Sequence, residues 1–540
     1  MNGQEDAGSL RVFRVKWVKW REKSMQERTG EMGVLSGLKP KRVFEIFEEL
    51  TRIPRGSYNE KAVSDYIAGY GRARGLKVIQ DSLYNVIIIR EADAGRENEP
   101  AVILQGHIDM VNEKTPDSTH DFTKDPLDIY IDGDHIRARG TTLGGDDGIA
   151  VAYMLAILDE KDIALPRLEM VFTVSEEVGM EGAAGIDVSP LQGRQLINVD
   201  SEEEGILLAG CAGGMRARIA FPLTRIEEKG SEKAVEKAAE TEDAVEAERD
   251  FYKNAEIYKL RITGLLGGHS GSEIDKQRIN ADHTLARILL QLIGQGFDIR
   301  LVSVSGGGKD NAIPFEAEAI LYAAKADKAP ITEKLSKIEQ EIRNEYRNTD
   351  GGIKLIFEEY SAGEEKPFAA LDAACMKKAL GLILALPNGI VKMSGDIEGL
   401  VETSLNLGIV KTEKDEMILT YALRSSVDSA KKALAERVSL IAENYGAAIS
   451  FHGEYPAWEY KESSALRDKM VNVFEKMYER KPEVTVIHAG LECGLLADKL
   501  PGLDAISFGP DLFDVHTVNE HLSISSAERM YEYLLEVLKA

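Results

Sequence analysis

The sequence predicts an α/β protein whose first domain has a mixed, largely parallel sheet and whose second domain is an inserted α+β unit of two similar halves. Three observations lead to this prediction. From residue 34 to about residue 212, strand-like apolar runs alternate with helical stretches, the order that builds a parallel sheet. A highly charged stretch then interrupts this alternation, and about the last eighty residues return to it.

The elements of the first domain follow from the period of their apolar residues. Between Val43 and Leu50 these residues recur at helical spacing, which predicts an amphipathic helix that ends before Pro54. The run Ile149–Leu158 is apolar on nearly every side, which predicts a helix that is buried all round. The other expected elements are a helix over Val63–Tyr70 and strands over Leu76–Ile79, Val86–Ile89, Ala101–Leu104, Leu168–Val174 and Gln195–Val199.

The middle of the chain shows a weak internal duplication. A strand at Tyr258–Ile262, a helix at Ile279–Ile293 and further strands are expected first. The same order then returns with a strand at Gly352–Glu358 and a helix at Leu371–Leu386. This duplication predicts that the second domain consists of two α+β halves.

The expected second domain covers residues 213–456, and residues 34–212 and 457–540 are expected to form the first domain. Within the second domain, Glu227–Asp250 is almost wholly charged or alanine. Such a stretch has too few apolar side chains to join a core. We therefore expect a solvated helix or a disordered insertion there.

Composition excludes several classes of partner. The 540-residue chain carries a net charge of −25, so nucleic acid and anionic membrane surfaces would be repelled. Its three cysteines, Cys211, Cys375 and Cys493, lie far apart and predict neither a disulfide framework nor a cysteine zinc site, which favours a cytoplasmic location. No uninterrupted run of about 18 apolar residues occurs, so no membrane span is expected.

The N-terminal residues 1–33 differ from the rest of the chain. Leu10–Lys23 is basic and rich in aromatic side chains. One interpretation is an arm for a membrane surface or nucleic acid. The favoured interpretation is a disordered extension, with Met25 or Met32 as the natural start, and no secretory signal is expected because no apolar segment follows the charges.

The chemistry is expected at the ends of the predicted strands, where sites form in α/β sheets. His107 and Asp109 follow the strand Ala101–Leu104, and their spacing puts both side chains on one face of an extended segment. Imidazole binds zinc, cobalt and manganese, and a nearby carboxylate commonly orients it. Taken alone, however, a histidine at this place is more often a simple hydrogen-bonded residue.

Further carboxylates stand at later helix and strand ends. Asp146 lies at the start of the apolar helix, and taken alone it is better explained as an N-cap. Glu176 and Glu177 follow the strand Leu168–Val174, and Asp200 follows the next one. Two adjacent carboxylates repel each other, so they either face water or bind something positive.

Five side chains taken together favour the metal interpretation: His107, Asp146, Glu177, Asp200 and His516. Two histidines, several carboxylates, no cysteine and one surplus glutamate are typical of a two-metal hydrolytic site, in which both ions share a bridging carboxylate. The paired glutamates then have separate roles, because one can bind metal while the other serves as the general base.

Six motifs complete a resemblance to a known family. In chain order they read GHIDMV, TTLGGDDG, SEEVGMEGA, INVDSEEEG, GGHSG and HAGLECG. This series resembles the M20 family of metallopeptidases, and within it the cytosolic aminoacyl-histidine (Xaa-His) dipeptidase branch. The resemblance runs from about Val34 to the C-terminus and leaves out the basic arm and Glu227–Asp250. It implies a zinc-exopeptidase-like catalytic domain, with the inserted domain as a lid.

The resemblance also implies how the strand-end residues divide between two divalent ions. His107, Asp146 and Asp200 would hold one ion. Asp146, Glu177 and His516 would hold the other, so that Asp146 bridges the pair. Family members use zinc, and cobalt or manganese often substitutes for it.

Two more residues near these ligands receive roles from the resemblance. Glu176 would take a proton from the attacking water and pass it to the leaving amine. Asp109 would hydrogen-bond His107 and tune it.

The inserted domain would supply substrate contacts. By resemblance, His269 would polarise the scissile carbonyl and Arg424 would bind the terminal carboxylate of the substrate. Without the family, these two would be taken for a loop histidine and a surface arginine. Asn311 is expected to bind substrate, although packing in a tight turn is equally open. The segment HTVNEH keeps the threonine that follows the last ligand in this branch but then departs from the pattern, which leaves specificity at the rim open.

The expected function is a cytoplasmic dipeptidase that hydrolyses short unblocked peptides, Xaa-His dipeptides among them. No nucleic acid or membrane partner is expected, and a homodimer is one open arrangement. Alternatives on the same scaffold are a tripeptidase, an aminoacylase or a carboxypeptidase. An alternative of another class is a non-catalytic binding protein structured by metal, which would be expected to lack Glu176.

Overall fold

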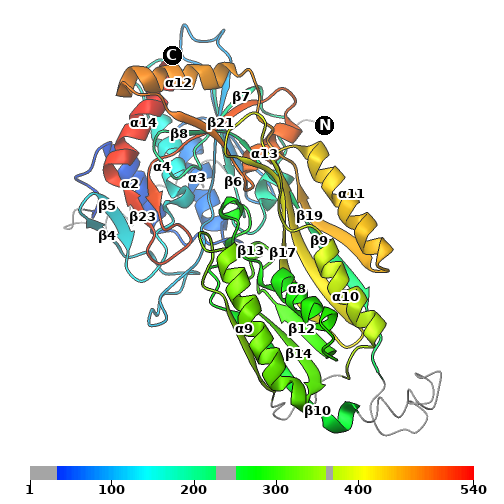
Figure 1. Ribbon diagram of the computed structural model, residues 1–540. Helices are drawn as coiled ribbons and strands as arrows, with labels where there is room; N and C mark the ends of the chain where they lie inside the picture. Colours follow the sequence, from blue (N-terminus) through cyan, green and yellow to red (C-terminus); the bar gives the residue numbers. More distant parts are fainter. Residues whose placement is uncertain (1–32, 227–250, 361–368) are drawn as a thin grey trace, which may run out of the picture. The chain divides into compact units, whose positions relative to one another are not determined.

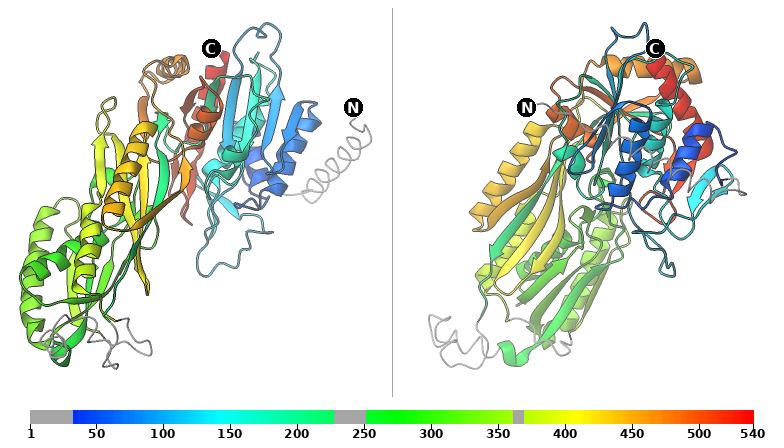
Figure 2. Two further views of the ribbon diagram at one scale, coloured as in Figure 1. Left: turned by 90° about the vertical axis from the view of Figure 1, so that its right-hand side faces the viewer. Right: turned by 180° about the vertical axis from the view of Figure 1, so that it is seen from behind.

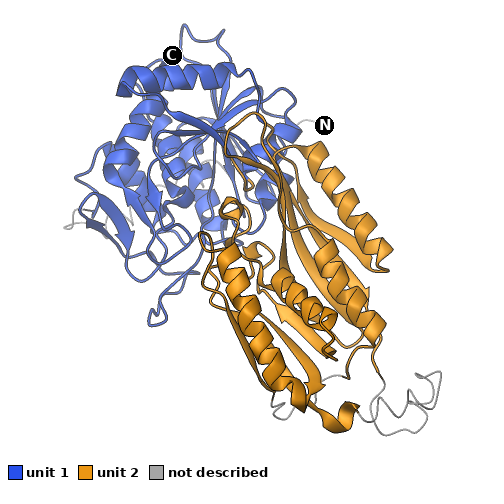
Figure 3. Cartoon of the chain, in the orientation of Figure 1, with its two compact units in different colours: residues 1–211, 460–486, 491–540 blue, residues 212–459, 487–490 orange. Residues whose placement is uncertain are grey.

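The computed structural model describes residues 33–226, 251–360 and 369–540 (Figures 1 and 2). These residues divide into two compact units, of which the first contains residues up to 211 together with 460–486 and 491–540, and the second contains the rest (Figure 3). Residues 1–32 of the basic arm and the charged stretch Glu227–Asp250 lie outside the described residues.

The first unit contains an eight-stranded mixed sheet. Its strands lie in the order β1 (Lys77–Gln80), β2 (Val86–Arg90), β6 (Leu168–Thr173), β3 (Val102–His107), β7 (Gln195–Asn198), β21 (Asp504–Ser507), β8 (Ile206–Cys211) and β20 (Glu483–Ile487). The adjacent strands β6, β3, β7 and β21 are parallel. β1 pairs antiparallel with β2, β2 with β6, and β8 with β21. The predicted α/β class is confirmed, and the sheet is mixed: the short turn between β1 and β2, for example, permits only antiparallel pairing there.

Helices and a smaller sheet complete the first unit. The helices are α2 (Lys41–Leu50), α3 (Lys61–Ala73), α4 (Gly145–Ile157), α5 (Glu181–Gly185), α12 (Ala465–Tyr478), α13 (Glu492–Lys499) and α14 (Ile524–Lys539). The smaller sheet has the order β22 (Leu512–Phe513), β23 (His521–Ser523), β5 (His135–Ala138) and β4 (Ile129–Asp132). Every residue of β3 and β6 is buried, as expected for parallel strands that are covered on both faces. All residues of α4 except Asp146 are buried too, in line with its apolar sequence.

The second unit contains a nine-stranded sheet. Eight strands lie in the order β15 (Lys354–Glu359), β10 (Ala255–Thr263), β14 (Ala317–Ala324), β12 (Arg300–Gly306), β17 (Val401–Thr412), β18 (Glu416–Ser425), β9 (Gly213–Pro222) and β19 (Ala448–Tyr455), and β16 (Gly389–Met393) pairs with β17. A separate two-stranded sheet joins β11 (Gly268–His269) to β13 (Ala312–Ile313). The long helices are α8 (Ala281–Gly294), α9 (Lys328–Glu345), α10 (Ala373–Ala385) and α11 (Asp428–Asn444).

All four of these helices lie on one face of the large sheet (Figures 1 and 2). Buried residues alternate with less buried ones along β14 and along most of β9, which agrees with a sheet that is packed on one face only.

The second unit consists of two halves with the same order of elements. Apart from the short strands β11, β13 and β16, one half is β10, α8, β12, β14, α9 and β15, and the other is β9, α10, β17, β18, α11 and β19. In each half the last strand is outermost and the second strand is innermost. The halves join where β12 pairs antiparallel with β17, with Ser305 opposite Lys411.

Two assignments made from the sequence were wrong. The strand near Gly352–Glu358 does not open the second half, because β15 pairs with β10 and so closes the first half. The second half begins instead with β9, which precedes the charged stretch. Residues 487–490 belong to the second unit, and the amide of Ala212 donates to the carbonyls of Ile487 and Ala489. Both errors concern contacts between segments far apart in the chain, which local patterns do not reveal.

None of the helices in the described ranges is long and apolar enough to span a membrane.

Candidate functional site

Three adjacent strands of the first unit bring the predicted metal ligands to one edge of its sheet. His107 is the last residue of β3, Glu177 lies in the turn after β6, and Asp200 lies two residues after β7. Since these strands are parallel neighbours, their C-terminal ends meet at the same edge. Asp146 comes from the first turn of α4, and His516 lies on the loop between β22 and β23.

Asp146 lies between the two histidines. Its Oδ1 atom is 2.9 Å from Nε2 of His107, and its Oδ2 atom is 3.1 Å from Nε2 of His516. Asp200 Oδ1 lies 3.6 Å from His107 Nε2, and Glu177 Oε2 lies 3.0 Å from His516 Nε2. The carboxylate of Asp146 therefore joins a group around His107 to a group around His516.

The donor atoms of this cluster fit divalent cations. Two sets, His107–Asp146–Glu177 and His107–Asp147–Asp200, each place one donor atom per residue within 4.8 Å of the others. The Oε1 atom of Glu177 is buried and has no hydrogen-bond partner within the described ranges. Imidazole and carboxylate groups without thiolate suit zinc, cobalt or manganese.

The carboxylate of Asp146 does not cap helix α4. The N-cap residue is Gly144, and the backbone of Asp146 is not helical, with φ −78° and ψ 110°. This backbone turns the carboxylate of Asp146 toward the histidines. The N-cap alternative for this residue was wrong, because its two carboxylate oxygens contact the imidazoles of His107 and His516 and no side chain caps the helix.

Asp147 also belongs to the cluster and received no role from the sequence. Its side chain is buried, and its Oδ2 atom accepts a hydrogen bond of 3.2 Å from the amide of His107. In a regular helix two adjacent side chains point about 100° apart, so only one of the pair would be expected at the site. The adjacency of two aspartates behind a glycine pair was the available signal.

Asp109 connects His107 to the turn that carries the paired glutamates. Its Oδ1 atom is 3.3 Å from His107 Nδ1 and accepts a hydrogen bond of 3.0 Å from the amide of Glu176. Its Oδ2 atom accepts from the amide of Glu177 at 3.3 Å. The carboxylate is completely buried, so it fixes both neighbours in place.

The cluster holds an excess of negative charge, as its pKa values indicate. Burial raises the pKa of Asp200 to about 6. Burial and the neighbouring carboxylates, Asp200 foremost, raise the pKa of Glu176 well above its usual value. Hydrogen bonds to Asp146 and Glu177 raise the pKa of His516 to about 11. Carboxylates that are so strongly stabilised by bound protons would also be stabilised by bound metal cations.

His269 lies in the second unit, where β11 pairs with β13. Its Nδ1 atom accepts hydrogen bonds from the amides of Gly271 and Ser272, at 3.3 and 3.1 Å. In the neutral imidazole this pattern places the proton on Nε2. His269 can therefore donate a hydrogen bond through Nε2.

Arg424 lies near His269 in the same unit. Its Nη1 atom donates to the hydroxyl of Tyr455 at 3.0 Å, and its Nε atom is buried without a hydrogen-bond partner in the described part of the chain. A Cβ atom at Gly271 would lie 3.0 Å from His269 Cε1 and 3.1 Å from Arg424 Nε. Arg424 is buried, which contradicts its interpretation as a surface arginine.

His488 completes this second cluster. The Nε2 atom of His488 lies 2.7 Å from the hydroxyl of Ser404, and its carbonyl would lie 2.5 Å from a Cβ at Gly271. Asn311 contacts the cluster through its backbone, because its carbonyl accepts from the amide of Ser270 at 2.8 Å. The second unit thus gathers His269, Arg424 and His488 around one glycine.

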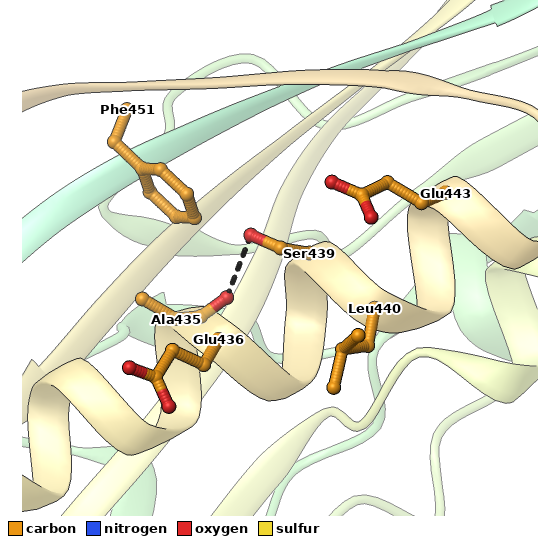
Figure 4. Close-up of a pocket in the computed structure, with 6 residues that line it drawn as sticks. All are labelled: Ala435, Glu436, Ser439, Leu440, Glu443 and Phe451. Atoms are coloured by element: carbon orange, nitrogen blue, oxygen red, sulfur yellow. Dashed lines mark hydrogen bonds between the residues drawn. The ribbon is translucent and has the colours of Figure 1, made fainter.

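A surface hollow of the second unit contains none of the predicted residues. It is lined by Ala435, Glu436, Ser439, Leu440, Glu443 and Phe451, from α11 and β19 (Figure 4). The hydroxyl of Ser439 donates to the carbonyl of Ala435 at 3.0 Å, so it is engaged within the helix. The lining residues suggest no catalytic chemistry.

Comparisons with known proteins agree with the motifs. Residues 103–540 match peptidase family M20/M25/M40. The chain is 36% identical over 509 residues to the cytosol non-specific dipeptidase of Escherichia coli K12. The matched region covers 94% of this chain and 99% of the relative.

Two solved structures share the fold. The aminoacylhistidine dipeptidase of Vibrio alginolyticus matches with a TM-score of 0.81 and 33% identity, over 95% of this chain and 99% of the other. A tripeptidase of Staphylococcus aureus matches with a TM-score of 0.51 and 15% identity, over 93% and 98%. From these matches, the chain belongs to peptidase family M20/M25/M40.

Proposed function

We propose that this protein is a dinuclear metal-dependent dipeptidase that hydrolyses short unblocked peptides, Xaa-His dipeptides among them. The observation that carries the proposal is the carboxylate of Asp146, whose two oxygens lie 2.9 and 3.1 Å from the Nε2 atoms of His107 and His516. The related dipeptidases of Escherichia coli and Vibrio alginolyticus support the substrate class.

Two sets of side chains would hold the ions. His107, Asp146 and Asp200 would bind one, and Asp146, Glu177 and His516 the other. Zinc is our proposed metal, with cobalt or manganese as substitutes, because the donors are imidazole and carboxylate groups. When bound, such ions lower the pKa of water and polarise a carbonyl group.

Glu176 would act as the general base and then as the general acid. Its carboxylate accepts a proton from the attacking water, and the same proton passes to the amine nitrogen as the C–N bond breaks. Asp109 supports the step, since it binds the amide of Glu176 at 3.0 Å.

The second unit would supply the groups that recognise substrate. Arg424 is proposed to bind the terminal carboxylate of the peptide in bidentate fashion. His269, which presents Nε2–H as a donor, is proposed to stabilise the oxyanion. A contact between substrate and Asn311 is part of the same proposal.

The cellular setting is proposed as well. We place the enzyme in the cytosol, as the name of the Escherichia coli relative suggests. A homodimer is our working assembly, and no nucleic acid or membrane partner is proposed for a chain of net charge −25.

Metal analysis and one substitution test the catalytic proposal. Purified protein should contain two divalent ions per chain. Glu176→Gln should retain both ions yet lose at least about 1,000-fold in kcat, in the upper part of the range for loss of general-base catalysis. The matched control is Glu181→Gln, in the neighbouring helix α5, which should keep parental activity. Parental turnover in Glu176→Gln would refute the role of the base.

A substrate panel tests specificity. The panel contains Xaa-His dipeptides, other dipeptides, tripeptides and N-acyl amino acids, compared by kcat/KM. The proposal expects dipeptides with a free carboxylate to be the best substrates. A preference for tripeptides or N-acyl amino acids would instead indicate a tripeptidase or an aminoacylase, and bound metal without hydrolysis would indicate a binding protein.

A further inference from the structure

We propose that Arg55, Ser57, Glu60 and Glu520 are positioning residues that hold the ligand-bearing loops of the first unit in the arrangement that binds metal. These four are called the frame residues below. None of them is a predicted metal ligand, and the proposal rests on the dinuclear function proposed above. Three of them lie in the short segment RGSYNE before helix α3, and Glu520 lies four residues after His516.

Arg55 joins two ligand loops through their backbone carbonyls. Its Nη1 atom donates to the carbonyls of Ile108 and Asp109, at 3.0 and 2.9 Å. Its Nη2 atom donates to the carbonyl of Gly144, two residues before Asp146. Arg55 is only 2% exposed. One buried cation thus fixes the distance between the loop after β3 and the loop before α4.

Glu520 holds the second of these loops from its amide side. Its Oε2 atom accepts from the amides of Leu143 and Gly144, at 2.7 and 3.0 Å. Its Oε1 atom accepts from the amides of Gly145 and Asp146, at 2.7 and 3.3 Å. Four consecutive amides therefore bind one carboxylate, which is itself only 3% exposed.

Ser57 and Glu60 extend the frame to the turn that carries the paired glutamates. The hydroxyl of Ser57 donates to Asp109 Oδ2 at 2.8 Å. Glu60 Oε1 accepts from the amide and the hydroxyl of Ser175, at 3.1 and 2.7 Å. Ser175 directly precedes Glu176 and has a φ of 52°, a conformation that a serine adopts only when its surroundings hold it.

Two considerations favour a positioning role over simple stabilisation. First, Gly144 and Gly145 have no side chains that could fix their backbone, and Gly144 has a φ of 66°. A Cβ there would lie 2.5 Å from Arg55 Nη2, so the loop and the arginine are closely fitted. Second, a buried charge is costly unless it is paired and hydrogen-bonded. Arg55 and Glu520 keep their hydrogen bonds to the backbone only while both loops keep their places.

The consequence for metal binding follows from pre-organisation. Without the frame, the ligands would have to be ordered when the ions bind, and that cost would reduce the binding free energy. Outer residues that orient metal ligands typically contribute a factor of about 10 to 100 in metal affinity. We expect effects of this size for Arg55 and Glu520.

The test compares frame variants with matched controls in the metal-free protein. The variants are Arg55→Lys, Glu520→Gln and Ser57→Ala. Arg467→Lys is the matched control for the arginine, because buried Arg467 donates to the carbonyls of Lys461 and Glu462 at 2.6 and 2.7 Å. Each protein is titrated with Zn²⁺ against a chromophoric chelator, and its unfolding midpoint is measured without metal.

A second control matches the carboxylate. Glu169 is completely buried and accepts from the amides of Gln192 and Gly193, at 2.9 and 3.0 Å, so Glu169→Gln removes a similar charge. The controls should lower the unfolding midpoint and leave Zn²⁺ affinity at the parental value. Arg55→Lys and Glu520→Gln should weaken Zn²⁺ binding at least about tenfold, and excess Zn²⁺ should restore part of their kcat.

The outcomes separate this inference from the function it rests on. If the parent protein binds fewer than two Zn²⁺ ions, the dinuclear proposal fails. If the parent binds two and all folded frame variants bind them equally tightly, the positioning role is refuted. Should Arg55→Lys and Glu520→Gln fail to fold, Ser57→Ala decides, because it removes a single hydroxyl that binds Asp109 and leaves the buried charges intact.

Discussion

His488 should make the stability of the second unit depend on pH below neutrality. The imidazole is buried, and its Nε2 atom lies 2.7 Å from the hydroxyl of Ser404. Burial first of all, and then the electrostatic effect of the neighbouring Arg424 and His269 side chains, lowers the pKa of His488 from 6.5 to about 3. The folded unit therefore keeps this side chain neutral at pH values where the unfolded chain protonates it.

The sign and size of the effect follow from proton linkage. As the pH falls below 6.5, the unfolded state binds a proton that the folded state does not, so stability falls until the pH reaches the folded pKa of about 3. At pH 5 the pH lies 1.5 units below the pKa of 6.5 that the imidazole has in the unfolded chain, and one unit corresponds to about 1.36 kcal/mol. The second unit should therefore lose about 2 kcal/mol between pH 7.5 and pH 5 through His488 alone.

A single tryptophan allows this loss to be measured in the second unit. Trp458 is buried there, and the other two tryptophans, Trp17 and Trp20, can be replaced by phenylalanine. Urea unfolding followed by Trp458 fluorescence then gives the free energy of unfolding at both pH values. His488→Gln in the same background keeps an amide near Ser404 and cannot be protonated.

The comparison is the difference between the two proteins at each pH. Relative to His488→Gln, the parent should lose about 2 kcal/mol on going from pH 7.5 to pH 5. Other titrating groups cancel in this difference. If the difference in free energy of unfolding between the parent and His488→Gln is the same at pH 7.5 and pH 5 within about 0.5 kcal/mol, His488 is not held neutral by its surroundings and the reasoning fails.

Three further predictions concern other residues and the ions. Asp282 is buried with no hydrogen-bond partner for either oxygen among the described residues, and burial raises its pKa. Asp282→Asn should therefore gain stability relative to the parent as the pH rises from 5 to 8, and equal urea curves would contradict this. Arg424→Lys should raise KM for dipeptides about tenfold or more with a smaller change in kcat, because lysine loses the bidentate contact; an unchanged KM would argue against the carboxylate role. If the proposed ions are bound, removing them should destabilise the first unit by about 2.7 kcal/mol for each site at a free metal concentration of 100 times its Kd. Calorimetry with and without a chelator measures this loss, and an unchanged unfolding temperature would contradict metal binding there.

The sequence predicted that the candidate ligands would lie together at one edge of a sheet, because that signal is local. His107, Glu177 and Asp200 each follow an apolar run that reads as a strand, and parallel strands end at the same edge of a sheet. That reasoning needs no knowledge of which strands are neighbours. The same locality explains why the α/β class could be predicted.

The frame residues could not be predicted from the sequence because their contacts are long-range. Arg55 lies in a turn-like segment, and its acceptors are backbone carbonyls 53 to 89 residues further along the chain. Glu520 binds amides more than 370 residues away. Almost any residue type can supply a backbone acceptor or donor, so no sequence pattern could reveal these contacts. The assignment of β15 to the wrong half has the same cause, since strand pairing is not visible in strand order.

The join between β12 and β17 has a consequence for how chains of this kind can assemble. The first half of the second unit is one continuous segment inserted after β9, so a shorter chain could omit it and still contain a complete β9–α10–β17–β18–α11–β19 half. In such a chain β16 would still pair with the first part of β17, but the stretch at Val410 and Lys411 that pairs with β12 would lose its partner. Because the two halves share one order of elements and meet through an antiparallel pair, two shorter chains could restore the same join across a twofold axis. In the duplicated unit, therefore, a single polypeptide holds two similar halves together through the same contact that would join two shorter chains in a dimer.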